Sequence, residues 1–176
     1  CPGDYVLVRT WQAVDRCGNA SAEARQIVTV VDTTPPVVAA AGAGAHCLWP
    51  PRHRPVHFTR ADFDPLVTDA CSGPVSWRFH DCASDQADDA NGTGDGSTDG
   101  DCAVGPDGEG FAVRAERDGT GSAGRRYAVS VVATDACGNA SAPAVIGHVV
   151  VPHDAREASR CNDRFGRDAR DAGSRR

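Results

Sequence analysis

A ten-residue segment that occurs twice constrains the fold of this chain more than any other feature. Residues 13–22 read AVDRCGNASA and residues 133–142 read ATDACGNASA, so eight of ten positions are identical at a spacing of 120 residues. Each copy follows an alternating stretch and precedes a β-branched one, which predicts two strands joined by a turn. Asp15 and Asp135 could ligate an ion, but we favour a role in capping the amides of their own turn. Each copy therefore predicts a β-hairpin at the end of one domain.

The positions of the two hairpins divide the chain into four parts. Residues 1–33 hold a hairpin without the strands that should precede it, so we interpret them as the C-terminal part of a truncated repeat. Residues 34–46 open with two prolines that cannot donate a ladder hydrogen bond and continue with Ala and Gly, which predicts a linker. Residues 47–154 should form a complete domain, and the Arg- and Asp-rich residues 155–176 a mobile tail.

Short apolar segments separated by turn residues predict an all-β fold, and no convincing amphipathic helix is visible. The expected strands are residues 5–13, 26–31, 56–58, 66–68, 75–79, 111–117, 127–133 and 145–151.

The cysteines indicate the compartment. Their even number in a turn-rich chain, without any Cys-x-x-Cys pair, favours disulfides over a zinc site or redox thiols. We therefore expect an extracellular or cell-surface location. A bridge from Cys47 to Cys161 would tie the tail to the entry of the domain. The eight cysteines are Cys1, Cys17, Cys47, Cys71, Cys82, Cys102, Cys137 and Cys161.

Charge and hydropathy argue against two classes of partner. The net charge is -6 and no basic run is interleaved with aromatic residues, so we expect no nucleic-acid binding. No apolar stretch approaches the roughly 20 residues that span a bilayer, so we expect no membrane insertion. All 18 basic residues are Arg, which we attribute to the codon usage of a GC-rich genome.

Several short motifs carry a family resemblance. They are RTW at 9–11, DRCGN at 15–19, VVDTTP at 30–35, LWPPRH at 48–53 and TDAC at 68–71. With them the chain resembles the tandem immunoglobulin-like repeats of bacterial surface proteins, which are related to hyalin repeats. The resemblance implies an immunoglobulin-like β-sandwich preceded by the last strands of a similar repeat, and an extracellular stalk-like or adhesive module without catalytic activity.

The resemblance also implies one disulfide. In the family arrangement the strand ends that carry Cys71 and Cys137 meet, so these two cysteines are expected to pair. By the same logic Cys17 belongs with a cysteine of the missing half-domain, and the partners of Cys1 and Cys17 stay open. A bond between Cys71 and Cys137 would close a loop of about 65 residues, which should stabilise the domain by about 4 kcal/mol.

The family gives no guidance for an acidic insertion at residues 81–102. It contains seven Asp and no basic residue, so it carries -7 while the rest of the chain carries +1. Oxygen ligands on a Gly-rich backbone suit Ca²⁺ better than Zn²⁺ or Mg²⁺, although Gly100 stands where an EF-hand needs Glu. An equally open alternative is a solvated loop closed by Cys82 and Cys102. The candidate calcium ligands are Asp85, Asp88, Asp89, Asn91, Asp95, Asp99 and Asp101.

No arrangement of nucleophile and base, and no Gly-rich phosphate loop before a helix, points to catalysis. We therefore expect a non-enzymatic structural or adhesive module that needs no cofactor and whose partners are other domains of the same protein. The alternative is an accessory domain of a secreted hydrolase, which would bind a surface glycan or a protein through Trp49 and the acidic insertion.

Overall fold

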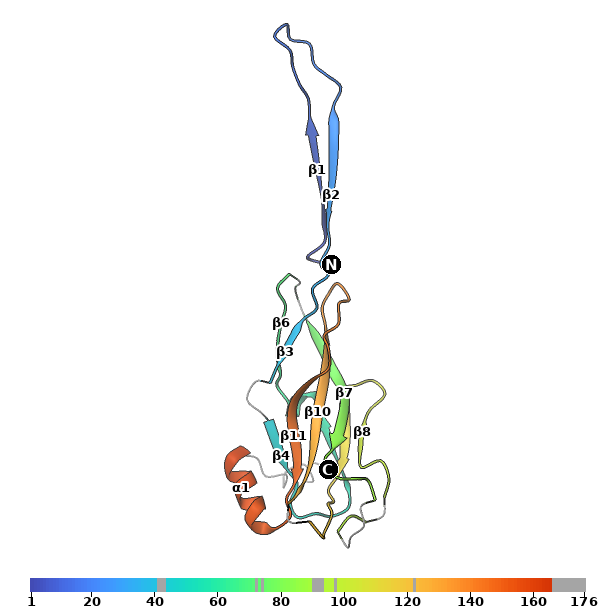
Figure 1. The fold of residues 1–176 in the computed structure, drawn as a ribbon, viewed down its shortest axis with the longest axis vertical. Coiled ribbons are helices and arrows are strands. Elements are labelled where there is room, and N and C mark those ends of the chain that lie inside the picture. The colour runs from blue at the N-terminus through green and yellow to red at the C-terminus, as the bar shows by residue number, and fades with distance from the viewer. Residues whose placement is uncertain are drawn as a thin grey trace, which may run out of the picture.

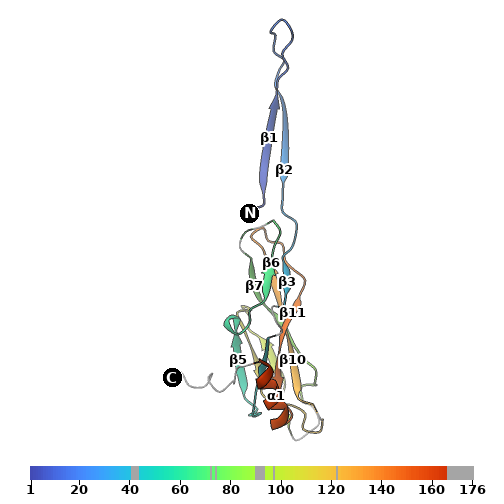
Figure 2. The ribbon, with the colours of Figure 1, turned by 90° about the vertical axis from the view of Figure 1, so that its left-hand side faces the viewer.

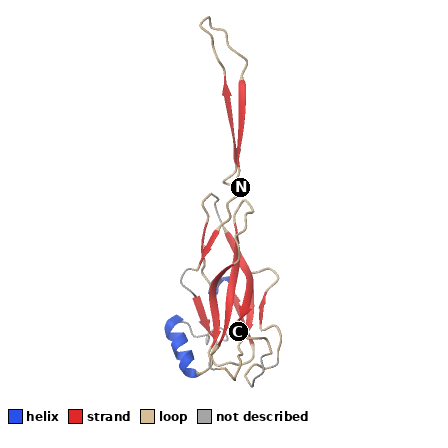
Figure 3. Ribbon diagram, viewed as in Figure 1, coloured by secondary structure: helices blue, strands red, loops and turns tan. Residues whose placement is uncertain are grey.

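The computed structural model describes residues 1–40, 44–71, 73, 75–89, 94–96, 98–121 and 123–165, and within them the fold is all-β, as predicted (Figures 1 and 3). Its strands are β1 (Tyr5–Trp11), β2 (Ala24–Val30), β3 (Val37–Ala39), β4 (Gly44–Cys47), β5 (Pro55–Thr59), β6 (Leu66–Thr68), β7 (Ser76–Ser84), β8 (Cys102–Val104), β9 (Gly110–Arg114), β10 (Arg125–Thr134) and β11 (Ala144–Val151). A 3-10 turn η1 (Arg60–Asp62) and a helix α1 (Ala155–Phe165) complete the described elements.

Strands β3 to β11 form two layers around one core. One layer is the sheet β4-β11-β10-β7, and the other consists of β5-β9-β8 and the pair β3-β6. The alternation predicted for β10 is observed, because Tyr127, Val129 and Val131 are fully buried. Phe111 of β9 stacks on Phe58 of β5 at 5.1 Å between ring centroids and meets Phe79 of β7 at 4.9 Å, so aromatic side chains join the layers. The immunoglobulin-like assignment itself stays a prediction.

The pair β1-β2 stands apart from these layers. It projects along the long axis of the molecule, beyond the end where the turn between β10 and β11 lies (Figures 1 and 2). Every residue of β1 is exposed, although the strand contains Tyr5, Leu7 and Trp11. Alternating apolar residues normally mark a face that is covered, so this hairpin shows a sheet face without its second layer.

The predicted linker at residues 34–46 contains regular structure. Val38 of β3 pairs with Val67 of β6, and His46 of β4 lies opposite Val149 of β11 in a parallel ladder. The interpretation as a linker was therefore wrong for β3 and for the start of β4. Pairing with strands distant in sequence outweighs the weak strand propensity of an Ala/Gly-rich segment.

The predicted mobile tail begins with a helix, so the prediction was wrong for residues 155–165. The Asp154 carboxylate accepts a hydrogen bond from the Glu157 amide at 2.8 Å and so caps the N-terminus of α1. Ala158 and Cys161 are buried, and a disulfide joins Cys161 to Cys47. A covalent anchor and one small apolar face thus order a very polar segment. The remaining tail, residues 166–176, lies outside the described residues.

Candidate functional site

A buried arginine holds the acidic insertion against the lower end of β10. Arg125 is fully buried, and its guanidinium contacts Asp101 at 2.6 Å, Asp95 at 3.3 Å and Asp88 at 3.1 Å. It also donates hydrogen bonds to Ser84 Oγ at 2.7 Å and to the backbone carbonyl oxygens of residues 86 and 87. The guanidinium of Arg125 therefore donates to several acceptors of the insertion, and these contacts compensate for the burial of its charge.

A third buried acid joins this group from the end of β9. Glu116 is fully buried, accepts a hydrogen bond from Thr98 Oγ1 at 2.5 Å and lies 3.2 Å from His53 Nδ1. Arg114 Nε lies 3.6 Å from Glu116 and 3.4 Å from Asp101. Burial raises the pKa of the Glu116 carboxyl, against the hydrogen bond from Thr98, and its contact with Asp101 raises it further.

We call Asp95, Asp101, Glu116, Arg114 and Arg125 the acidic network. One oxygen from each of its three acids lies within 4.8 Å of the others, which is close enough to hold a metal ion. However, guanidinium groups already lie among these acids: Arg125 contacts Asp95 and Asp101, and Arg114 lies near Asp101 and Glu116. The arrangement resembles a structural ion-pair network more than a cation site, and such networks fix one conformation of the groups they join.

The structure separates most of the predicted calcium ligands. Within the described residues, only Asp95 and Asp101 of the predicted set belong to a cluster of metal-binding size. Asp85 accepts a hydrogen bond from the Arg126 amide at 2.8 Å, whereas Asp89 and Asp99 are exposed. Asp88 contacts Arg125, and Asn91 lies outside the described residues.

Three residues of the acidic network, Arg114, Glu116 and Arg125, were not among the predicted site residues. A signal for Arg125 was present, since it lies two positions before Tyr127 and therefore on the inward face of β10. No comparable signal existed for Glu116, because it follows Ala115 out of phase with the buried residues of β9.

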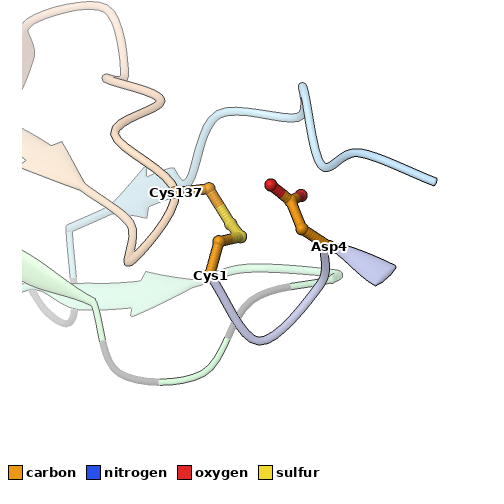
Figure 4. Close-up of side chains that lie close together, drawn as sticks. All are labelled: Cys1, Asp4 and Cys137. Atoms are coloured by element: carbon orange, nitrogen blue, oxygen red, sulfur yellow. A yellow bond between two sulfur atoms is a disulfide. The ribbon is translucent and has the colours of Figure 1, made fainter. Parts of the chain in front are cut away.

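A second candidate site lies where the two hairpins meet. Cys137, in the turn between β10 and β11, forms a disulfide with Cys1 (Figure 4). The resemblance had implied Cys71 as its partner, and that prediction was wrong. Cys71 carries an exposed free thiol. Its backbone lies close to Gly3, because a Cβ atom added to Gly3 would stand 3.3 Å from the Cys71 carbonyl oxygen. Cys1, at the start of the chain, therefore takes the position beside Cys137 that was expected for Cys71.

Hydrogen bonds reinforce this junction. Asn139 Nδ2 donates to the backbone carbonyl oxygen of Asp32 at 3.1 Å, and the Asp32 amide donates to Asp4 Oδ1 at 2.8 Å. Asp32 and Asp135 are both buried there. We call residues 1–4 together with Asp32 the hairpin base of β1-β2. The turn of one hairpin thus binds the base of the other through a covalent bond and a hydrogen bond.

The other disulfides connect the segments that the sequence analysis connected. Cys47 pairs with Cys161, and Cys82 pairs with Cys102 across the acidic insertion. The remaining cysteine, Cys17, is exposed and free. Trp49 is half-buried between β4 and β5.

Comparison with family models, with curated proteins and with solved structures gives no match to this chain. Among the described residues, no helix has the length and apolar character needed to cross a membrane.

Proposed function

We propose that this chain is a non-catalytic structural module of an exported bacterial protein, in which similar units are joined end to end through their hairpins. The observation that carries the proposal is the junction, where the turn of β10-β11 binds the base of β1-β2. A disulfide together with a partly buried hydrogen bond gives a joint of fixed direction, which is what a stalk or spacer requires.

The pairing of the first hairpin supports its origin in a similar unit. Trp11 lies opposite Ala24 in β1-β2, and Val131 lies opposite Ala144 in β10-β11. The second pair of residues is the first pair shifted by 120 positions, which is the spacing of the repeat. In β10-β11 the equivalent strands are covered by β7 on one edge and β4 on the other. The exposed β1-β2 hairpin therefore corresponds to the final two strands of a unit of the same kind.

Two further features agree with a structural role. The grouped carboxylates contact arginines, so they are placed to hold the insertion in position and not to exchange protons with a substrate. Three disulfides join segments 20, 114 and 136 residues apart, which suits a protein that works in an oxidising, extracellular compartment.

X-ray scattering of the oxidised protein tests this proposal. We expect an elongated particle whose distance distribution fits one fixed arrangement of the hairpin and the sandwich. The variant C1S should give a broader distribution because it lacks the covalent joint, whereas C17S, which removes a thiol outside the junction, should match the wild type. A wild-type distribution as broad as that of C1S would contradict a fixed joint.

The accessory-domain alternative has its own readout. Saturable binding of a glycan or a protein that Trp49→Ala abolishes, with the fold intact, would replace the structural proposal by the alternative one.

A further inference from the structure

The turn of the second hairpin shows what this motif does when it has a partner. Residues 135–139, the second tip, contribute Cys137 to the disulfide with Cys1 and the Asn139 side chain to the hydrogen bond with Asp32. Asp135 becomes buried in the contact region. The second tip is therefore a docked surface, and the hairpin base is its partner.

Residues 15–19, the first tip, have the same internal structure. Asp15 Oδ1 accepts hydrogen bonds from the amides of Cys17 and Asn19 at 2.8 Å, and its Oδ2 accepts one from the Asn19 side chain at 2.8 Å. The equivalent three distances around Asp135 are also 2.8 Å. Hydrogen bonds from Asn19 lower the pKa of the Asp15 carboxyl against a smaller effect of burial. Burial acts most strongly on Asp135 and opposes the shift, but the hydrogen bonds from Asn139 and Cys137 together lower the pKa of its carboxyl. Both tips are thus preorganised in one conformation.

The first tip differs from the second in having nothing docked on it. All of its residues are exposed, and Cys17 is a free thiol. Within the tips the sequences differ at one position, where Arg16 corresponds to Ala136. Because Ala136 is exposed at the junction, a longer side chain at this position can extend into solvent. The substitution therefore does not prevent the first tip from docking in the same way.

We propose that the first tip is a docking surface for the base of another hairpin of this type, carried by a neighbouring unit. This inference rests on the proposed function, and it names the partner of the first tip. The partner base would supply a thiol to Cys17 and, from the segment leaving its hairpin, a backbone carbonyl oxygen to the Asn19 side chain. Bond formation joins the two sulfur atoms and releases two protons and two electrons to a disulfide oxidant, which is reduced to two thiols.

The first test gives the docked tip the sequence of the undocked one. The double variant T134V/A136R makes residues 133–142 identical to residues 13–22. During oxidative refolding with glutathione disulfide, it should form the Cys1–Cys137 bond as completely as the wild type. N139A serves as the control and should form this bond more slowly, because it cannot donate to Asp32.

The disulfides Cys47–Cys161 and Cys82–Cys102, which we call the two lower disulfides, report folding in the same samples. If T134V/A136R keeps Cys47–Cys161 and Cys82–Cys102 but leaves Cys1 and Cys137 open to alkylation, the first-tip sequence cannot dock on such a base and the proposal is overturned.

The second test uses the base of another copy as the probe. C71S/C137S retains Cys1 and Cys17 as its only cysteines outside the two lower disulfides. The seven residues of β1 separate them by about 23 Å at the rise of a strand, so a Cys1–Cys17 bond must link two molecules. Oxidation should yield head-to-tail oligomers with this bond, whereas the wild type, whose Cys1 is engaged with Cys137, should form no Cys1–Cys17 bond.

Links only between identical cysteines, or no oligomers at all, would overturn the docking proposal. The scattering test of the fixed joint does not depend on Cys17, so the two proposals fail separately.

Discussion

The buried guanidinium of Arg125 should be the most sensitive point of the domain. Arg125→Met preserves much of the side-chain length but removes the positive charge between Asp95 and Asp101, which are 1% exposed. Removing one partner of a buried ion pair typically costs about 3–5 kcal/mol, because the remaining charges stay buried without compensation. The hydrogen bond to Ser84 is lost as well.

Urea unfolding of the oxidised protein at neutral pH measures this cost directly. For a chain of this size, a loss of about 3–5 kcal/mol corresponds to a fall in melting temperature of roughly 6–20 °C. The neighbouring variant Arg126→Met is the matched control, since that side chain is exposed and should change stability by less than about 0.5 kcal/mol.

A double variant separates electrostatics from packing. D101N/R125M removes one of the two buried carboxylates that face Arg125 as well, so it should be more stable than R125M alone. A loss below about 1 kcal/mol in R125M would refute the reasoning, because a buried pair that is broken on one side costs more than that. Equal stability of R125M and D101N/R125M would assign the loss to packing instead of charge.

Three further outcomes are expected. Burial raises the pKa of Glu116 above its ordinary value of 4.5, so above that pH the folded protein keeps a proton that the unfolded chain has released. This group therefore makes the free energy of unfolding fall as pH rises from 4.5 through the raised pKa. Glu116→Gln should flatten that decline, measured as urea midpoints between pH 4.5 and neutrality. In C1S, Cys137 should pair with Cys71, whose backbone adjoins the hairpin base, and peptide mapping that finds both thiols alkylated would exclude this. A chelator should leave the melting temperature unchanged, since Arg114 and Arg125 already contact the acids of the network, whereas a fall of about 4 °C or more would support the calcium site predicted at residues 81–102.

Local pattern was sufficient for the strands that carry strong alternation or β-branched runs. Leu66–Thr68 was predicted with its observed bounds, and both hairpins were placed from the repeated turn. Such elements are specified by their own residues, because the buried face of β10 and the turn chemistry around Asp135 agree with each other.

Elements that depend on distant partners could not be predicted in this way. Strand β4 has an Ala/Gly-rich start and is stabilised by its parallel ladder with β11, and α1 is a polar segment held by Cys161. The partner of Cys137 depends on where the first hairpin lies relative to strands β3 to β11, which no local pattern encodes. The acidic insertion was recognised as unusual, but the positive charge that holds it comes from Arg125 of β10, which lies more than twenty residues after the insertion in the sequence.

Peptide mapping of the native protein under non-reducing conditions, after alkylation of accessible thiols, tests the end-to-end joint most directly. For this chain on its own, we predict a Cys1–Cys137 peptide together with alkylated Cys17 and Cys71. A Cys71–Cys137 peptide with Cys1 alkylated would mean that the second tip closes on its own domain, and the covalent joint between the two hairpins would be disproved.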